Sequence, residues 1–557
     1  MPTTGPLSAP IAEPDGTLRG ILERQAGRLG SCPFVHLPDG TLTYADADEL
    51  ANRTANALAG IGVGRGDIVA ARAGNGVAML ATWFGCAKLG AVFMPVNPLL
   101  SHAPLANVLA HAGAATMICD AALAAEVVAV RHDLPLLQRL VVAGGSVSAA
   151  DAGGHTWSFD DLVGSAPSSP PDALDDRPGA PTKLMYTSGT TGTPKGVVWS
   201  RHCEAVWARC YGDELIEIDE GEAVYCCLPL SHATCQGTTL SALWRGGRIT
   251  IDAAFDPFGF WTRVRESEAA VFTFVGTLLA VLGRRRPRPD DLDNPVRRIL
   301  GSAAPIDLWR HIEERFGLEI MEVWGQTETA SCWTRPFSLP QDPGTIGRPT
   351  ERFEVRLVEP GGAEVPPGVP GELWIRPTEA HVMFEGYLDH GAVSAESWTD
   401  DGWYRTGDLM SARPDGELSF VGRQREAIRR RGEMIATSDI EAAALTHPGV
   451  AEAVAVGVPD AAGVEDEIKL CVVAEDGGAI DVVVLDAHLR ASLPRFMVPR
   501  YLAVLDSLPK TPTTRVRKHA LSDSGAAGAW DTRRRAVVPP DPRSDETERS
   551  ATCRNSP

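Results

Sequence analysis

The sequence predicts an α/β fold with a large N-terminal domain and a small α+β domain near the C-terminus. Up to about Gly347, short apolar runs rich in β-branched residues alternate with longer helical patterns. This alternation is typical of parallel sheets that are covered by helices on both faces. After Gly347 the strands become short and are separated by turns, and past Gly422 a compact segment follows with its own pattern.

The first part of the chain contains a series of near-continuous apolar runs that we expect to be buried strands. They read DIVAARA, TMICD, RLVVAG, KLMYTS, AVYCCLPL, RITIDA, AVFTFV and RRILGSA. Open sheets of this kind bind ligands at the carboxyl ends of their strands. Residues that carry chemistry are therefore expected in the loops that follow these runs.

The later elements are shorter. The runs FEVRLVEP, GELWIRP and GELSFVGR indicate a small β-rich subdomain. Beyond it, TSDIEAAALTH is expected to be a helix, and VAEAVAVGVP, IKLCVVAED and YLAVLDSLP are expected to be strands. We expect a flexible N-terminus over 1–20, an N-terminal domain over 21–422, a C-terminal domain over 423–522 and a disordered tail over 523–557. The tail is rich in Arg, Asp, Ser and Pro and has few apolar residues.

The composition excludes several classes of function. A net charge of -20 over 557 residues argues against nucleic acid as a partner, because phosphate binding needs a basic face. The first residues show neither a basic nor an apolar region of a signal peptide, and no apolar run is long enough to span a membrane. The 11 cysteines lack a disulfide-like spacing, which fits reduced thiols and a cytoplasmic protein.

Two further features of composition bear on the site. Cys226, Cys227 and Cys235 form a tight group, for which zinc binding and core packing are the two interpretations. Adjacent strand residues point to opposite faces, which favours core packing. The chain also has only six lysines, so that 46 of its 52 basic residues are arginines. A single Arg in place of an expected Lys can therefore reflect composition alone.

The strongest functional signal is YTSGTTGTPKG, from Tyr186 to Gly196, directly after the strand KLM. Gly and hydroxyl residues at this density expose backbone N–H groups and side-chain donors to an oxyanion, and Lys195 adds a mobile positive charge. The GxxxxGK[ST] spacing of a Walker A loop is absent. The segment resembles the phosphate loop of the superfamily of acyl-CoA synthetases, luciferases and nonribosomal-peptide adenylation domains.

Other segments agree with this resemblance in the order of that family. They are GSAAP (Gly301–Pro305), VWGQTE (Val323–Glu328), YRTGDL (Tyr404–Leu409) and the segment that opens with Arg423. The resemblance implies a large domain of two stacked α/β subdomains and a β-rich subdomain, followed by a mobile C-terminal lid. It also implies that the enzyme joins a carboxylic acid to AMP with ATP and Mg²⁺, and passes the acyl group to a thiol, usually coenzyme A.

The resemblance also assigns roles to single residues. Trp324 would stack on adenine, Thr327 would touch the α-phosphate, Glu328 would hold Mg²⁺ and Asp408 would accept hydrogen bonds from the ribose. The full set expected to bind ATP is Thr187, Ser188, Gly189, Thr190, Thr191, Gly192, Ser302, Ala303, Ala304, Trp324, Gly325, Gln326, Asp408 and Arg423. The residues expected to be catalytic are Lys195, His232, Thr327, Glu328 and Arg515. A flat apolar Trp face suits adenine, and Mg²⁺ prefers a few carboxylates together with phosphate oxygens.

The acid pocket is expected next to His232, where the family places a gating aromatic residue or His; packing is the alternative for a lone His. The neighbouring residues are small and mildly polar: Cys235, Gln236, Thr238, Val275, Gly276, Thr277 and Cys332. Gly276 stands where many relatives have Pro. Without an obvious buried cation for a second carboxylate, this composition favours a small or medium acid.

The hinge of the lid falls on Arg425, a position that is usually Asp or Lys in the family. Beyond it, Arg429, Arg430 and Arg431 precede Gly432, which in relatives flanks the pantetheine tunnel. The three arginines are expected either to bind a coenzyme A phosphate or to form a solvated turn.

The closing loop departs from the family. In LPKTPTTRVRKHAL the usual Gly-Lys pair falls on Thr514 and Arg515. Arg515 would replace the catalytic Lys, or Lys510 or Lys518 would reach in, or the activated acid is unusual. Arg is a planar fork and Lys a compact charge, so the two do not place charge at the same point.

Three hypotheses follow for the function. The first is an ATP-dependent ligase of small or medium carboxylic acids with coenzyme A. The second keeps the adenylate but changes the acid or the acceptor, as in an amide ligase or a nitrite-activating diazotase of secondary metabolism with an amine acceptor. The third is a non-catalytic nucleotide-binding homologue. A homodimer is left open as the assembly.

Overall fold

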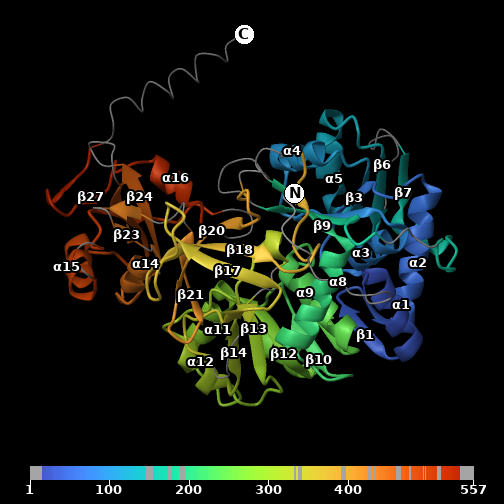
Figure 1. The fold of residues 1–557 in the computed structure, drawn as a ribbon, viewed down its shortest axis with the longest axis horizontal. Coiled ribbons are helices and arrows are strands. Elements are labelled where there is room, and N and C mark those ends of the chain that lie inside the picture. The colour runs from blue at the N-terminus through green and yellow to red at the C-terminus, as the bar shows by residue number, and fades with distance from the viewer. Residues whose placement is uncertain are drawn as a thin grey trace, which may run out of the picture.

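A computed structural model describes residues 16–145, 155–172, 177–187, 195–330, 334–335, 341–389, 397–423, 428–430, 433–435, 437–459, 466–475, 478–493, 495, 497–510 and 516–539. Figure 1 shows the N-terminal two thirds of the chain on one side and the C-terminal segment, from α14 onward, on the other. The antiparallel strands β17, β18, β20 and β21 lie between them. The predicted α/β class is confirmed by this arrangement.

The sheet that carries most of the candidate site has the strand order β14-β13-β12-β10-β11-β1-β2. Its pairs are parallel except β1 with β2. Its strands are β1 (Pro33–Leu37), β2 (Gly40–Thr43), β10 (Ala223–Cys226), β11 (Arg248–Ile251), β12 (Ala269–Val275), β13 (Arg298–Ser302) and β14 (Glu319–Glu322). Because β10, β12, β13 and β14 are parallel, their carboxyl ends meet at one edge.

The second large sheet has the order β19-β9-β8-β4-β3-β5-β6-β7. Its strands are β3 (Ile68–Arg72), β4 (Val92–Pro95), β5 (Thr116–Asp120), β6 (Arg139–Ala143), β7 (His155–Ser158), β8 (Pro181–Thr187), β9 (Lys195–Ser200) and β19 (Gly386–Tyr387). The strands β8 and β9 pair antiparallel, and their register opposes Thr187 to Lys195. The predicted phosphate loop thus connects the two strands of a hairpin.

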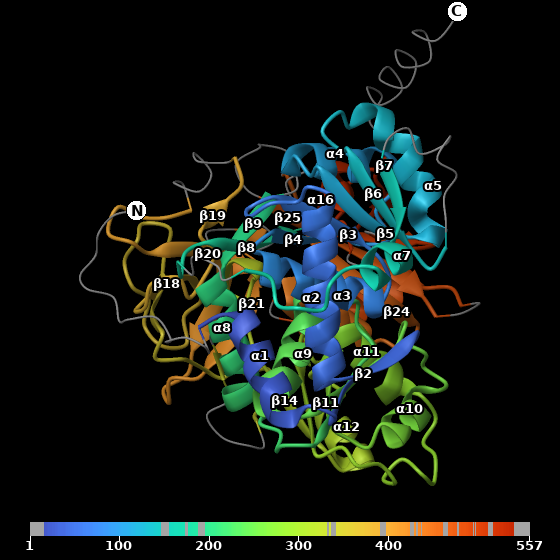
Figure 2. The same cartoon turned by 90° about the vertical axis from the view of Figure 1, so that its right-hand side faces the viewer.

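Helices cover both large sheets, and Figure 2 shows α2 and α3 running alongside one another through the middle of this part of the molecule. The helices of the N-terminal part are α1 (Leu18–Leu29), α2 (Tyr44–Gly60), α3 (Val77–Leu89), α4 (His102–Ala112), α5 (Ala121–Val130), α7 (Phe159–Gly164), α8 (Arg201–Arg209), α9 (Ala233–Arg245), α10 (Phe260–Glu266), α11 (Gly276–Arg284) and α12 (Trp309–Phe316). One apolar core joins both sheets through α2, α3, α8 and α9. A second core packs α4 and α5 on the other face of the second sheet.

The β-rich subdomain and the C-terminal segment follow. The subdomain is an antiparallel sheet of β17 (Phe353–Val358), β18 (Gly371–Pro377), β20 (Tyr404–Ala412) and β21 (Leu418–Arg423). Two short pairs are β15 (Thr334–Arg335) with β16 (Arg348–Pro349), and β22 (Ile428–Arg430) with β23 (Glu433–Ile435). The C-terminal elements are α14 (Thr437–Leu445), β24 (Val450–Pro459), β25 (Asp466–Ala474), α15 (Val482–Ser492), β26 (Tyr501–Leu505), α16 (Lys518–Asp523), β27 (Trp530–Asp531) and β28 (Ala536–Val537).

The expected disorder of 523–557 is wrong for residues 524–539. Strand β27 pairs with β26 and extends the C-terminal sheet. Asp531 is 1% exposed, accepts the backbone N–H of Arg533 and forms an ion pair with Arg500 at 3.2 Å. The segment also packs apolar residues against the C-terminal core, among them Ala529 at 0% exposed and Trp530, although its apolar content is low.

The expected flexible N-terminus also ends earlier than residue 20. Helix α1 begins at Leu18, and the Thr17 hydroxyl caps it by accepting the N–H of Gly20. Leu18 is buried in the core.

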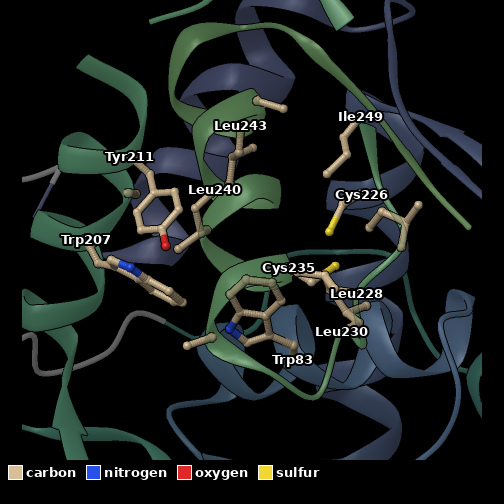
Figure 3. Packing of buried hydrophobic residues seen from close by; sticks show 14 of the residues in the cluster. Trp83, Trp207, Tyr211, Cys226, Leu228, Leu230, Cys235, Leu240, Leu243 and Ile249 are labelled. Carbon is tan, nitrogen blue, oxygen red and sulfur yellow. The ribbon is translucent and has the colours of Figure 1, made fainter. Parts of the chain in front are cut away.

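The three clustered cysteines are buried in the apolar core, which confirms the packing interpretation. Figure 3 shows Cys226 and Cys235 among Leu228, Leu230 and Trp83. Within the ranges given above, no helix has both the length and the apolarity that crossing a membrane requires.

Candidate active site

Asp408, in the middle of β20, is the centre of the candidate nucleotide site. It is 2% exposed, and its Oδ2 accepts hydrogen bonds from the Trp324 indole N–H and from the Gln326 amide, both at 2.8 Å. Arg423 lies opposite it on β21, with Nε 3.3 Å from Oδ1. Two segments more than 80 residues apart in sequence therefore meet at one carboxylate, as the motif order predicts.

Gln326 fixes this contact from a second side. Its amide also donates to the carbonyl oxygen of Thr406 at 2.8 Å. With the hydroxyl of Tyr404, which donates to Gln326 Oε1 at 3.4 Å, four hydrogen bonds attach the segment after β14 to β20 and fix Trp324 relative to Asp408. The indole of Trp324 is largely buried.

Glu328 lies in the short 3₁₀ helix η3 (Thr327–Thr329), beside Tyr387 of β19. The Tyr387 hydroxyl donates to Glu328 Oε1 at 2.8 Å, and Lys195 Nζ lies 4.8 Å from the centre of the Tyr387 ring. Burial raises the pKa of Glu328, while Tyr387, Arg423 and Lys195 oppose this shift. Tyr387 therefore lies between Lys195, which is predicted to contact the phosphates, and Glu328, which is predicted to bind the metal. No sequence motif predicted this contact.

The predicted adenine loop turns at Ala303, which has a φ of +59°. Glu322, the last residue of β14, holds this turn: its Oε1 accepts the backbone N–H groups of Ala303 at 2.6 Å and Ala304 at 3.3 Å. Burial raises the pKa of Glu322 to about 8, and the two hydrogen bonds only partly offset it. Ser302 ends β13 and is exposed.

Gly276 brings α11 against the same turn. A Cβ on Gly276 would lie 1.9 Å from the carbonyl oxygen of Ala303, so no side chain fits there without a shift of the loop. Val275 and Gly276 are partly exposed and Thr277 is exposed. The absence of a Cβ at this position thus keeps the acid-side and adenine-side loops in direct contact.

His232 stands at the start of α9, where its exposed ring caps the helix by accepting the N–H of Thr234 on Nδ1. The pocket residues expected after it divide between two faces. Cys235 and Gln236 are 0% exposed and face the core rather than the accessible side. Thr234, which sequence reasoning missed, is partly exposed.

Thr238 is buried, and its hydroxyl donates to the carbonyl oxygen of Thr234 and contacts Thr273 of β12. The residues that sequence reasoning placed in the pocket therefore take different directions along α9. Thr234 could have been predicted from helical spacing, because positions 234 and 238 lie on the same face of a helix.

Some predicted site residues lie outside the described ranges, so the structure says nothing of them. They are Ser188, Gly189, Thr190, Thr191, Gly192, Cys332, Arg425, Arg431, Gly432, Thr514 and Arg515. The described neighbours are Thr187 and Lys195, which end and begin the strands that flank the loop. Gly325 is exposed, and Gln326 and Thr327 are partly exposed.

The two lysines proposed as substitutes for the closing lysine both form ion pairs inside the C-terminal domain. Lys510 Nζ lies 2.5 Å from Glu452, and Lys518 Nζ lies 2.9 Å from Glu441. Lys518 also donates to the Thr437 hydroxyl at 2.8 Å.

Two family models match this chain. The family model of the AMP-binding enzyme matches residues 22–388, and the model of the AMP-binding enzyme C-terminal domain matches residues 439–515. The chain belongs to the AMP-binding enzyme family. The resemblance seen in the motifs is confirmed.

Relatives of this AMP-binding enzyme are ligases of diverse acids. It is 34% identical over 485 residues to a feruloyl-CoA synthase of an Amycolatopsis species, which covers 86% of this chain and 92% of the relative. It is 30% identical to a sulfoacetate–CoA ligase of Cupriavidus necator, over 90% of this chain and 96% of the relative.

Solved structures share the fold of this AMP-binding enzyme. An anthranilate CoA ligase in complex with anthranoyl-AMP superimposes with a TM-score of 0.82 at 23% identity, over 91% of this chain and 96% of that one. A benzoate CoA ligase from Burkholderia xenovorans gives a TM-score of 0.79 at 24% identity, over 91% and 99%.

Proposed function

We propose that this AMP-binding enzyme activates a small or medium carboxylic acid with ATP and transfers the acyl group to coenzyme A. The observation that carries the proposal is the junction at Asp408, where Trp324, Gln326 and Arg423 converge on one buried carboxylate. Such a junction fixes a flat aromatic group beside an acceptor for sugar hydroxyls. That pairing suits an adenosine.

In the first step, an oxygen of the acid carboxylate attacks the α-phosphorus of ATP, and pyrophosphate leaves. Asp408 accepts hydrogen bonds from the ribose hydroxyls, Trp324 packs on adenine, and Ser302, Ala303 and Ala304 border it. Lys195 and Arg423 offset the negative charge of the phosphates, and the loop from Thr187 to Gly192 donates hydrogen bonds to them. These groups act by orienting the reactants and stabilising charge.

Mg²⁺ fits the carboxylate of Glu328. Glu328 as a whole residue is partly exposed, and the Tyr387 hydroxyl orients one of its carboxylate oxygens. A bound Mg²⁺ would neutralise charge on the phosphates of ATP. Thr327, in the same turn, is placed to contact the α-phosphate.

In the second step, the coenzyme A thiol attacks the acyl carbon, the bond to the AMP oxygen breaks and AMP leaves. His232 and Thr234, with Val275 and Gly276, border the acid in this proposal. We place Arg425 at the hinge between domains 21–422 and 423–522. We also propose a cytoplasmic location, which fits the reduced, buried cysteines.

The test measures pyrophosphate release with MgATP and a panel of acids. The panel contains ferulate, sulfoacetate, 3-hydroxybenzoate, indoleacetate, benzoate and nitrite with an aromatic amine, each with and without coenzyme A. We expect release with at least one carboxylic acid and a coenzyme A thioester of the matching mass. Release with nitrite alone, or an amide in place of the thioester, would refute the proposal.

For the closing loop we propose that Arg515 takes the place of the usual lysine. Arg515→Ala is expected to lower the rate of adenylate formation by about 10²-fold, because one preorganised charge contact is lost. The affinity for ATP, measured by calorimetry, should change little. Unchanged adenylation would remove Arg515 from the site.

A further inference from the structure

Lys183 is a fully buried lysine in β8, the strand that leads into the predicted phosphate loop. It is 0% exposed, and its ammonium donates to Gln236 Oε1 at 2.8 Å and pairs with Glu204 Oε1 at 2.7 Å. Glu204, on α8, is 1% exposed. Burial lowers the pKa of Lys183, and Glu204 opposes that shift.

Three tryptophans surround this ammonium. The ring centres of Trp83, Trp207 and Trp199 lie 4.5, 4.8 and 5.1 Å from Lys183 Nζ. Trp83 also donates its indole N–H to Glu204 at 2.7 Å. Figure 3 shows Trp83 and Trp207 in this part of the core, near α9.

A buried ion pair of this kind is a poor source of stability, because the cost of removing two charges from water offsets their attraction. Such groups are better explained by the geometry that they impose. The contacts of the Lys183 partners show which geometry this is.

The first partner, Gln236, controls the turn before His232. Its amide donates to the carbonyl oxygen of Leu230 at 2.9 Å. Asn75 accepts the N–H of Leu230 at 2.6 Å and donates to the carbonyl oxygen of Leu228 at 3.0 Å. The turn that places His232 and starts α9 is therefore held by Asn75 on one side and by Gln236 on the other.

Trp199, one of the tryptophans around Lys183, contacts the segment on the nucleotide side of the site. Trp199 lies on β9, the strand that begins with Lys195, and its indole N–H donates to the carbonyl oxygen of Thr327 at 2.8 Å. The Lys183 ammonium is thus connected to each of two segments through one intermediate residue. Gln236 connects it to the acid-side turn at Leu230, and Trp199 connects it to the segment that carries Glu328.

We propose that Lys183 is a positioning residue that fixes the acid-binding turn, residues 228–232, relative to the Thr327 segment through Gln236 and Trp199. This inference rests on the proposed function for its kinetic test only. The acid and the α-phosphate must be held within a fraction of an ångström for in-line attack, and the network supplies a rigid link between the two sides.

The test uses the double variant Lys183→Met with Glu204→Gln, which removes the ion pair without leaving a buried charge alone. Gln236→Leu is a second variant that keeps the ion pair. Lys88→Met is the matched control, since Lys88 is also 0% exposed and paired, with Glu23 and Asp48, but lies in another part of the core.

Hydrogen exchange measured by mass spectrometry needs no substrate. We expect the amides of 228–238 to exchange about tenfold faster in both test variants, as the loss of one net hydrogen bond implies, and at the parent rate in Lys88→Met. Parent-like exchange in this segment in both test variants would overturn the proposal. This result stays informative even if the parent activates none of the panel acids.

The kinetic test uses MgATP and the panel acid with the fastest pyrophosphate release. The KM for the acid should rise about tenfold in both test variants, with the KM for ATP within about twofold of the parent. An equal rise in both KM values, or a loss of thermal stability with neither KM changed, would overturn the positioning role.

Discussion

Glu322 connects the stability of this enzyme to pH through the adenine loop. Its carboxyl is buried at the end of β14 and accepts the N–H groups of Ala303 and Ala304. Gln341 fixes its backbone by accepting its N–H and donating to its carbonyl oxygen. Burial raises the pKa of this carboxyl from about 4.5 to about 8, so the folded protein keeps a proton that the unfolded chain loses.

The sign of the effect follows from the protons bound. Between pH 4.5 and 8 the folded state binds more protons at this position than the unfolded state, so the free energy of unfolding falls as the pH rises. The largest slope is about 1.4 kcal/mol per pH unit. From pH 5.5 to 7.5 the two pKa values give a loss of about 2.5 kcal/mol from this residue alone.

Glu322→Gln removes the titration and keeps an oxygen that can accept the two N–H groups. We expect the difference in unfolding free energy between variant and parent to move in favour of the variant by about 2 kcal/mol from pH 5.5 to 7.5. Urea unfolding at intervals of half a pH unit measures it. Glu354→Gln, at an exposed carboxyl paired with Arg376, is the control. A constant difference across this range would refute the reasoning.

Three further predictions concern the site and the C-terminal sheet. Asp408→Asn should raise the KM for ATP about tenfold or more, since the ion pair with Arg423 is lost and the acceptor for the ribose is no longer charged. Asp342→Asn, at an exposed carboxylate paired with Arg413, should leave the KM unchanged, and equal kinetics of the two variants would contradict this. Gly276→Ala should slow pyrophosphate release about 10²-fold, because the added Cβ would collide with the carbonyl oxygen of Ala303. Gly60→Ala is the control, because a Cβ at that position meets no atom within 4 Å. Deleting residues 524–557 should lower the free energy of unfolding by about 3 kcal/mol, because the buried Lys469 ammonium loses Ser524 and Gly525 as acceptors and keeps only Leu521. Deleting 540–557 should not lower it, and equal melting curves of the two truncated chains would contradict this.

The sequence predicted the strands and the nucleotide motifs because both depend on local patterns. Continuous apolar runs mark β10, β12 and β13, and short polar motifs mark the loops at their ends. The junction at Asp408 was foreseeable because the family order places Trp324, Asp408 and Arg423 together. Contacts that depend on packing could not be foreseen in this way. Gln236 follows His232 closely in sequence but turns into the core, because α9 buries that face against β8 and α8.

Single polar residues in apolar strands were the other source of error. Lys183 and Glu322 lie in strands that read as buried, and nothing in their local sequence names a partner. Their partners come from other elements: Glu204 from α8 for Lys183, and the Ala303 turn for Glu322. The folded segment 524–539 escaped prediction for the same reason, since its polar composition hides the pairing of Asp531 with Arg500.

The placement of the lysines bears on Arg515. Lys88, Lys183 and Lys469 are almost fully buried, and Lys469 donates to the carbonyl oxygens of Leu521 and Gly525. Three of the six lysines thus place a compact ammonium in a closed space. Lys510 and Lys518 are already paired with glutamates of their own domain, so a role in closing would require breaking those pairs. The pairing of Lys510 and Lys518 favours the proposal that Arg515 itself is the closing residue, and on that proposal Arg515→Lys should retain adenylation.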